Sequence, residues 1–418
     1  MTTTTTGGQS TPEINTQRAL IFIVINVILD VIGIGIILPV LPDLIRELQP
    51  GSFADAAIYG GWLAFAYAFM QFIFAPILGN LSDAYGRRPV LIIGLLALGV
   101  DYIIMAVAPT MFLLFVGRVL AGAAGASFTT ASAYIADVSP PEKRAANFGL
   151  IGAAFGVGFV IGPAIGGLLG EYGTRVPFWA AAGFAFANAA FGYFVLPESL
   201  PKSKRRPFNL MRSNPFGAFK QLAGRRVVVM LVGAILVFEL AQQVYPSIWP
   251  YWGSETFGWG PREVGLTLAA FGVCIFIAEG LALRWLLTKV SEHVVIVSST
   301  LLALAVLTTI GLTNREWLIW VLLMPSAFSG FANSAIQGLA SNRVGDDQQG
   351  ELAGAITSGV AIVSFTAPVL MTSTFAAFSN PANDLPYLPG AAFLLAALIC
   401  VIMFIPYTIA RKRMGNEA

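Results

Sequence analysis

Histidine, cysteine and charged residues are scarce in this chain of 418 residues, and each scarcity excludes a class of function. The single histidine, His293, has no partner at metal-ligand spacing. The two cysteines, Cys274 and Cys400, both lie in apolar runs and define no disulfide framework. We therefore predict no metal site, and the lack of a nucleophile motif predicts that the chain is not an enzyme. Charged residues make up only 11% and hydrophobic residues 56%. A soluble domain carries about 25% charged residues, so this composition indicates a polytopic membrane protein.

Twelve apolar runs are long enough to cross a membrane, since a helix needs about 20 residues to do so. They begin near Ala19, Ala57, Pro89, Met111, Asn147, Pro177, Val227, Glu263, His293, Trp317, Gly350 and Leu388. The longest break between them, at 197–226, separates six runs from the other six. The sequence therefore predicts an all-α membrane protein with twelve transmembrane helices in two pseudo-symmetric six-helix halves.

The domain boundaries follow from these runs and from the distribution of basic residues. We predict a disordered tail at 1–18, halves at 19–196 and 227–410, a central loop at 197–226 and a tail at 411–418. The start has no basic region and no cleavage site, so we expect an uncleaved first span. Most of the 24 Lys and Arg residues fall on the side shared by both termini and the central loop. By the positive-inside rule that side is cytoplasmic, which predicts an inner-membrane protein. We expect the central loop to be a solvated linker, with lipid or protein docking as the alternative.

The loop after the second run, GNLSDAYGRRPV, contains a patterned turn. Gly79 and Gly86 frame it, and Asp83 stands four residues before Arg87, which Arg88 follows. The pattern resembles the signature loop of the major facilitator superfamily, with an alanine where many members carry arginine. With Asp137 and Arg144 after the fourth run, the resemblance implies a cytoplasmic charge-relay latch, whose ion pairs hold the outward-facing state and break during inward opening. The simpler alternative is a set of ordinary charged turns.

The fifth run carries regularly spaced small residues and a proline. Such residues allow close approach of helix backbones, and a proline bends a helix. The residues concerned are Gly158, Gly162, Pro163, Gly166 and Gly167. Their combination resembles the motif of the drug/proton antiporters within the superfamily. The resemblance implies that this motif seals one side of a cavity while the two halves rock.

Four segments resemble the tetracycline/proton antiporter family. They read LDVIGIGIILPVLP, AYAFMQFIFAPILGNLSDAYGRRPVL, DYIIMA and AYIADVSPPEKRA, and the likeness is denser in the first half than in the second. The resemblance implies the major facilitator fold and export of a small amphipathic compound in exchange for protons. The implied substrate is a tetracycline, taken as a magnesium chelate, or another antibiotic. We expect a monomer in the bilayer that is driven by the proton gradient, needs no cofactor and binds no nucleic acid.

Five ionisable residues fall inside the apolar runs: Asp30, Asp101, Arg118, Glu239 and Glu279. Charges in a membrane are costly and usually face a watery cavity, where they mark ion pathways; a purely structural pairing is the alternative. The resemblance implies transport roles for Asp30 and Asp101, and Arg118 is placed to neutralise a carboxylate. Glu239 and Glu279 stand where the family carries glutamine, and we interpret them as groups for proton coupling or cation recognition.

Two departures from the family concern proton coupling directly. A histidine of its eighth helix and an aspartate of its ninth are replaced here, by hand alignment, by Ile275 and Ala303. Glu279 is our candidate to load and release a proton in their place.

Neutral polar and aromatic side chains complete the predicted cavity. The polar candidates are Gln71, Gln242, Gln243, Asn333 and Gln337. The aromatic candidates are Tyr67, Trp249 and Trp252, although tryptophans at span ends are more often interface anchors than cavity residues. Two alternatives to drug export stay open: a proton-linked carrier for an endogenous metabolite, and a channel or receptor.

Overall fold

The structure is a computed structural model that describes residues 16–125, 127–209, 225–345 and 348–417, and within these ranges every regular element is helical. The first half contains α1 (Thr16–Ile37), α2 (Leu41–Leu48), α3 (Phe53–Tyr85), α4 (Arg87–Val107), α5 (Met111–Ala124), α6 (Ser127–Val138), α7 (Arg144–Gly170) and α8 (Val176–Val195). A short 3₁₀ turn at Pro141–Lys143 lies between α6 and α7, and a second at Lys202–Lys204 follows α8.

The second half continues with α10 (Arg226–Gln242), α11 (Val244–Phe257), α12 (Pro261–Ile277), the π-helical segment η4 (Ala278–Ala282), α13 (Leu283–Leu287), α14 (Glu292–Leu312), α15 (Glu316–Ser329), α16 (Phe331–Ser341), α17 (Gln349–Ser379) and α18 (Ala391–Glu417). Among the described residues, twelve helical stretches are long and apolar enough to span a membrane. The predicted all-α fold with twelve spans is confirmed.

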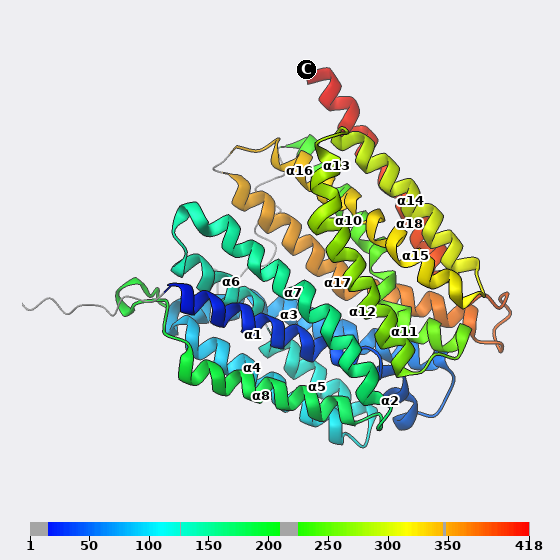
Figure 1. Cartoon of the computed structure of the whole chain (residues 1–418), viewed down its shortest axis with the longest axis horizontal. Helices are drawn as coiled ribbons and strands as arrows, with labels where there is room; N and C mark the ends of the chain where they lie inside the picture. Colours follow the sequence, from blue (N-terminus) through cyan, green and yellow to red (C-terminus); the bar gives the residue numbers. More distant parts are fainter. Residues whose placement is uncertain (1–15, 126, 210–224, 346–347, 418) are drawn as a thin grey trace, which may run out of the picture.

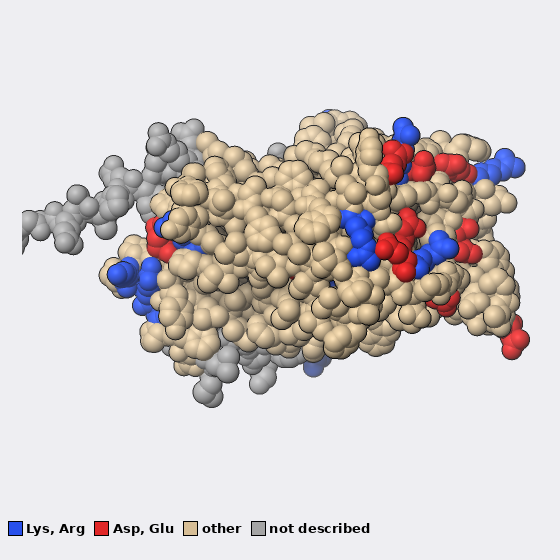
Figure 2. All heavy atoms as spheres, turned by 90° about the horizontal axis from the view of Figure 1, so that it is seen from below, with Lys and Arg blue, Asp and Glu red and all other residues tan. Residues whose placement is uncertain are grey.

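The surface of the molecule is divided as a membrane protein requires. Large apolar side chains such as Ile93, Phe112 and Phe194 are exposed along the helices. Figure 2 shows a broad band without charged atoms, and the Lys, Arg, Asp and Glu side chains gather towards the two ends of the molecule. Exposed apolar surface of this extent is stable only against lipid, because a soluble monomer exposes far smaller patches.

The two halves contact each other chiefly through α3 with α17 and α7 with α12. We call the end of the bundle at which α1 begins and α18 ends the termini side, and the opposite end the far side. The contacts between the halves lie towards the far side: a Cβ atom on Gly167 would lie 3.1 Å from the Cα of Gly265, and one on Gly61 would lie 3.1 Å from the Cβ of Thr372. The helices of the two halves diverge towards the termini side (Figure 1).

The predicted boundaries differ from the structure at the end of the chain. The predicted tail 411–418 is helical as far as Glu417, because α18 continues without interruption. The tail 1–18 lies outside the described residues up to position 15, as does 210–224 of the central loop.

Candidate functional site

Four of the twelve spans are interrupted part-way through the membrane. The fourth breaks at Gly125 between α5 and α6, the seventh at Gln243 between α10 and α11, and the tenth at Gly330 between α15 and α16. The eighth contains the π-helical segment η4, which includes Glu279. At Gln243 and Gly330 the irregularity is one residue long and the backbone stays close to helical. Discontinuous helices commonly form the sites of transporters, and π segments are frequent at functional sites.

In the first half, Asp101 of α4 forms an ion pair with Arg118 of α5. Asp101 is only 1% exposed, so its charge depends on this partner. Gly117 makes the approach possible, because a Cβ atom there would lie 2.8 Å from Asp101 Oδ1. The guanidinium of Arg118 also lies over the ring of Tyr67, 5.3 Å from its centroid. The structure thus brings together two residues that the sequence had singled out separately.

The other first-half candidates gather around the same tyrosine. The Tyr67 phenol lies within electrostatic range of both Asp30 and Arg118. Asp30 Oδ1 is buried and has no hydrogen-bond partner among the described residues. Gln71 donates from Nε2 to the carbonyl oxygen of Gly125 at 3.1 Å, which satisfies a backbone group freed by the break in the fourth span. The side chains of Asp30, Tyr67, Gln71 and Arg118 therefore lie in one region of the first half.

Tyr102 belongs to this region and was missed by sequence reasoning. Its side chain is buried, its hydroxyl lacks a hydrogen-bond partner within the described part of the chain, and it lies within electrostatic range of Asp30. Gly33 of α1 leaves room for it, since a Cβ atom there would lie 3.0 Å from the Tyr102 hydroxyl. The only sequence signal that could have identified Tyr102 was its position next to Asp101 within an apolar run.

In the second half, the polar candidates form a chain across three spans. Asn333 of α16 donates to Glu239 of α10, and Gln337 donates from Nε2 to Asn333 Oδ1 at 3.2 Å. Glu279 lies within electrostatic range of Glu239. It also faces the break in the tenth span, because a Cβ atom on Gly330 would lie 3.6 Å from Glu279 Oε1. Among the side chains that the structure describes, which do not include that of Arg284, neither carboxylate has a cationic partner.

The two glutamines at the break of the seventh span behave differently. The backbone N–H of Gln243 donates to the carbonyl oxygen of Glu239 at 3.0 Å and forms the turn itself. The side-chain oxygen of Gln242 is buried and has no hydrogen-bond partner in the part of the chain that is described. Gln242 is therefore available to a ligand or water at this break.

At the termini side, Arg87 is the centre of the predicted latch. It is 8% exposed and pairs with Asp83 at 2.5 Å and with Asp137 at 3.1 Å. Gly86 has a φ of 108°, a backbone conformation that favours glycine, and it separates α3 from α4. Arg88 donates to the carbonyl oxygen of Tyr193 instead of joining the ion pairs.

For two residues of the predicted latch, Gly79 and Arg144, the structure describes no latch contact. Gly79 is an ordinary helical position, where a Cβ atom would meet only Thr129 at 3.9 Å. Arg144 begins α7, and its side chain lies outside the described part of the structure.

Residues 198–200 and Arg205 of the central loop pack against the latch, while the other residues of 197–209 are exposed, as a solvated linker should be. Glu198 accepts from the backbone N–H of Arg87 at 2.8 Å and pairs with Arg205 at 3.7 Å. Ser199 donates to Asp137 at 3.1 Å, and Tyr134 donates to the Pro197 carbonyl at 2.9 Å. Sequence reasoning missed Glu198 because only tertiary contact links it to the signature loop.

The described latch contacts lie within the first half and the central loop, and they are formed in a conformation whose halves diverge at this end. The ion pairs of Arg87 with Asp83 and Asp137 therefore do not bridge the halves here. This differs from the expected order of events, in which the same pairs break when this end opens. The arrangement stiffens the first half.

The glycines of the antiporter motif have two separate packing partners. Gly158 and Gly162 lie against α1, where a Cβ atom on either would come within 3.0 Å of a backbone oxygen of that helix. Pro163 and Gly167 face α12 of the other half through Gly265. Gly166 lies against Ile36 of α1. The motif therefore fixes α7 within its own half and forms the contact between the halves near the far side.

The two tryptophan candidates are buried, and the replaced family positions are apolar. Trp249 and Trp252 do not anchor at a membrane interface, because both lie in an aromatic cluster with Trp259 and neighbouring phenylalanines. Trp249 also lines a small pocket within this half. Burial of the α11 ring system stabilises the far end of the second half. Ala303 is fully buried in the same core, and Ile275 packs against it.

A twelve-helix bundle in two halves, with polar groups at interrupted spans, is the architecture of a membrane transporter and not of an enzyme. The family model described as Major Facilitator Superfamily matches residues 23–368 and 231–416, and the chain belongs to this superfamily.

Relatives and solved structures agree with this assignment. The tetracycline resistance protein, class C, of Escherichia coli is 37% identical over 91% of this chain and 96% of its own length. Multidrug resistance protein 2 of Bacillus subtilis (strain 168) is 27% identical over 86% and 89%. A bacterial homologue of the human lysosomal transporter Spinster, solved inward-facing and unoccupied, superposes with a TM-score of 0.77 at 15% identity, covering 96% of this chain and 98% of that one.

Proposed function

We propose that this transporter exports a small amphipathic compound, with a tetracycline as the first candidate, in exchange for protons by alternating access. The observation that carries the proposal is the pair Glu239 and Glu279, two carboxylates beside interrupted spans without a cationic partner among the described side chains. Carboxylates in such a place bind protons or cations, since the membrane otherwise makes their charge costly.

The charge balance of the two halves supports this assignment of roles. In the first half, Arg118 already neutralises Asp101. In the second half, Glu239 receives only a neutral amide hydrogen bond from Asn333. Exchangeable positive charge, carried by a proton or by a cationic substrate such as a magnesium chelate, therefore has a place beside Glu239 and Glu279, and a second one beside Asp30, whose buried Oδ1 has no described hydrogen-bond partner.

We further propose that the protein works in the cell's inner membrane as a monomer without a cofactor, with both termini in the cytoplasm. The basic residues around the latch and central loop support this orientation through the positive-inside rule. The relatives are named as tetracycline resistance proteins, which supports a tetracycline as the substrate to try first.

The test is proton movement in everted membrane vesicles, followed with a pH-sensitive dye. We expect tetracycline with magnesium to release protons from vesicles that contain the wild type. Glu279→Gln should abolish this release, because the amide keeps the shape of the side chain and cannot carry the proton. Ser373→Ala, at an exposed position of α17, is a matched control for expression and insertion. Unchanged proton release by Glu279→Gln would remove Glu279 from the mechanism.

A second candidate function is export of other lipophilic compounds. It is favoured by Ile275 and Ala303, which stand at the coupling positions of the tetracycline antiporters. Proton release with lipophilic cations but not with tetracycline would select this candidate. Silence with both, in vesicles that contain folded protein, would favour a carrier for an endogenous metabolite.

A further inference from the structure

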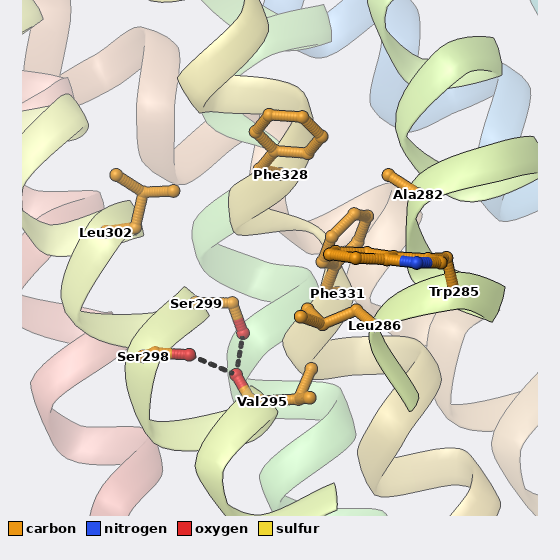
Figure 3. Close-up of a pocket in the computed structure, with 9 residues that line it drawn as sticks. All are labelled: Ala282, Trp285, Leu286, Val295, Ser298, Ser299, Leu302, Phe328 and Phe331. Atoms are coloured by element: carbon orange, nitrogen blue, oxygen red, sulfur yellow. Dashed lines mark hydrogen bonds between the residues drawn. The ribbon is translucent and has the colours of Figure 1, made fainter. Parts of the chain in front are cut away.

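A cavity of about 290 Å³ lies in the second half, away from the predicted central site. It is bounded by the end of the eighth span, by α14 and by the broken tenth span (Figure 3). The lining residues are Ala282, Trp285, Leu286, Val295, Ser298, Ser299, Leu302, Phe328 and Phe331. None of these nine side chains is charged.

The two lining serines do not make the cavity polar. Ser298 and Ser299 both donate to the carbonyl oxygen of Val295, at 3.3 and 2.5 Å, as the dashed lines in Figure 3 show. With these hydroxyl protons already donated, what the cavity mainly offers to a ligand is hydrocarbon and aromatic surface. In Figure 3 the rings of Trp285 and Phe331 reach towards the same space, which α14 closes on the other side.

The cavity lies at the lipid-facing surface. Trp285 in its wall is 64% exposed, and the adjacent Leu281 is 65% exposed. Both belong to the part of the bundle that we place in the bilayer, because they lie within the eighth span. A ligand dissolved in the membrane can therefore reach the cavity without passing through water.

One carboxylate lies directly beyond the wall of this cavity. Glu279 precedes the lining residue Ala282 by three positions, less than one helical turn. Gly330, which stands between the lining residues Phe328 and Phe331, has no side chain to separate them from Glu279: a Cβ atom there would lie only 3.6 Å from Glu279 Oε1. An apolar chamber and a carboxylate thus meet at the break in the tenth span.

We propose that this cavity is a lateral binding site for an amphipathic cation, whose aromatic part fills the apolar chamber and whose positive charge faces Glu279. A dry cavity of about 150 Å³ binds one benzene ring, so 290 Å³ suits a group of two rings. The charge decides between possible occupants, because a carboxylate attracts a cation and repels the phosphate of a lipid headgroup. The site rests on the proposed function in one respect, since it would deliver substrate to the coupling carboxylate.

The test uses two fluorescent probes that share one apolar rod. Diphenylhexatriene is neutral, and its trimethylammonium derivative carries a single positive charge. Purified full-length protein in detergent is titrated with each probe, and energy transfer from tryptophan measures binding. We expect saturable binding of the cationic probe and at least tenfold weaker binding of the neutral one. Glu279→Gln should reduce binding of the cation alone.

Filling the chamber should reduce binding of the cationic probe at least tenfold. Ala282→Phe fills the chamber from the eighth span, and Ser298→Phe fills it from α14. The test can be made as long as one of the two variants folds. Leu281→Phe is the matched control, because this neighbour is exposed and does not line the cavity. Equal saturable binding of both probes would identify a hydrocarbon or lipid site and overturn the proposal. The proposal would also be overturned if Ala282→Phe or Ser298→Phe eluted like the wild type on size exclusion and bound the cationic probe as the wild type does.

The binding titration needs no proton gradient, so the two proposals fail separately. Saturable binding that depends on Ala282 and Glu279 supports the lateral site even if drugs release no protons from vesicles. That second result would overturn only the proposed antiport.

Discussion

Of the two glycines of the signature loop, only Gly86 should destabilise the protein when it is replaced by alanine. Gly86 has a φ of 108° and a ψ of 155°, a combination that costs another residue about 1–3 kcal/mol. A Cβ atom there would also overlap the Glu198 carboxylate and the Arg205 guanidinium. Displacing Glu198 weakens its bond from the Arg87 N–H, and a hydrogen bond to a charged group contributes about 1.5–3 kcal/mol before discounting for partial exposure. We expect Gly86→Ala to destabilise the protein by about 2–4 kcal/mol.

Gly79→Ala is the internal control, because this position is helical and open. Its Cβ atom would meet only Thr129 at 3.9 Å, an ordinary contact. Alanine is favoured over glycine inside a helix by about 1 kcal/mol, so Gly79→Ala should be neutral or slightly stabilising. The assay is thermal unfolding of the purified variants in one detergent at one scan rate, with drug-dependent proton movement as a second readout. Equal midpoints for the two variants would refute the argument that Gly86 and its contact with Glu198 hold this turn.

Three further predictions concern buried or latch charges. Arg118→Gln should destabilise the protein by about 3–5 kcal/mol, since it leaves Asp101 buried without its partner; the double variant with Asp101→Asn should recover much of this loss in the same unfolding assay. Asp30→Asn should abolish gradient-driven transport while membrane insertion, judged from the amount in washed membranes, stays normal; normal transport would make Asp30 merely structural. Glu198→Gln should lower the unfolding midpoint less than Gly86→Ala does, because the amide oxygen still accepts from the Arg87 N–H, and a larger drop would contradict that order.

The spans could be predicted from the sequence because length and apolarity alone decide whether a helix can cross a bilayer. The ionisable residues inside spans could also be singled out, since a charge in an apolar run is conspicuous. Which of them pair could not be predicted. Asp101 and Arg118 lie on different helices, and their contact depends on a turn in between and on Gly117 leaving room.

The interruptions of the helices were not predictable either. A glycine within an apolar run is tolerated in many membrane helices, so Gly125 and Gly330 gave no clear signal among 43 glycines. The π-helical segment around Glu279 has no sequence signature that we know how to read. Glu198 was hidden for a third reason: it reaches the Arg87 N–H across 111 positions of the chain.

These contacts also bear on how the two halves can move. The contacts that join the halves on the far side, between Gly167 and Gly265 and between Gly61 and Thr372, are close approaches of backbone and small side chains. The ion pair of Glu171 with Arg262, which also joins the halves here at 3.6 Å, is about half exposed and contributes little, so separating the halves at this side costs mainly packing. The Arg87 latch, in contrast, lies within one half and its connecting segment. A rocking motion can therefore exchange the far-side contacts for new ones at the termini side while the latch moves as part of a stiff first half. The exchangeable charge then resides away from the latch, at the carboxylates Asp30, Glu239 and Glu279 inside the spans.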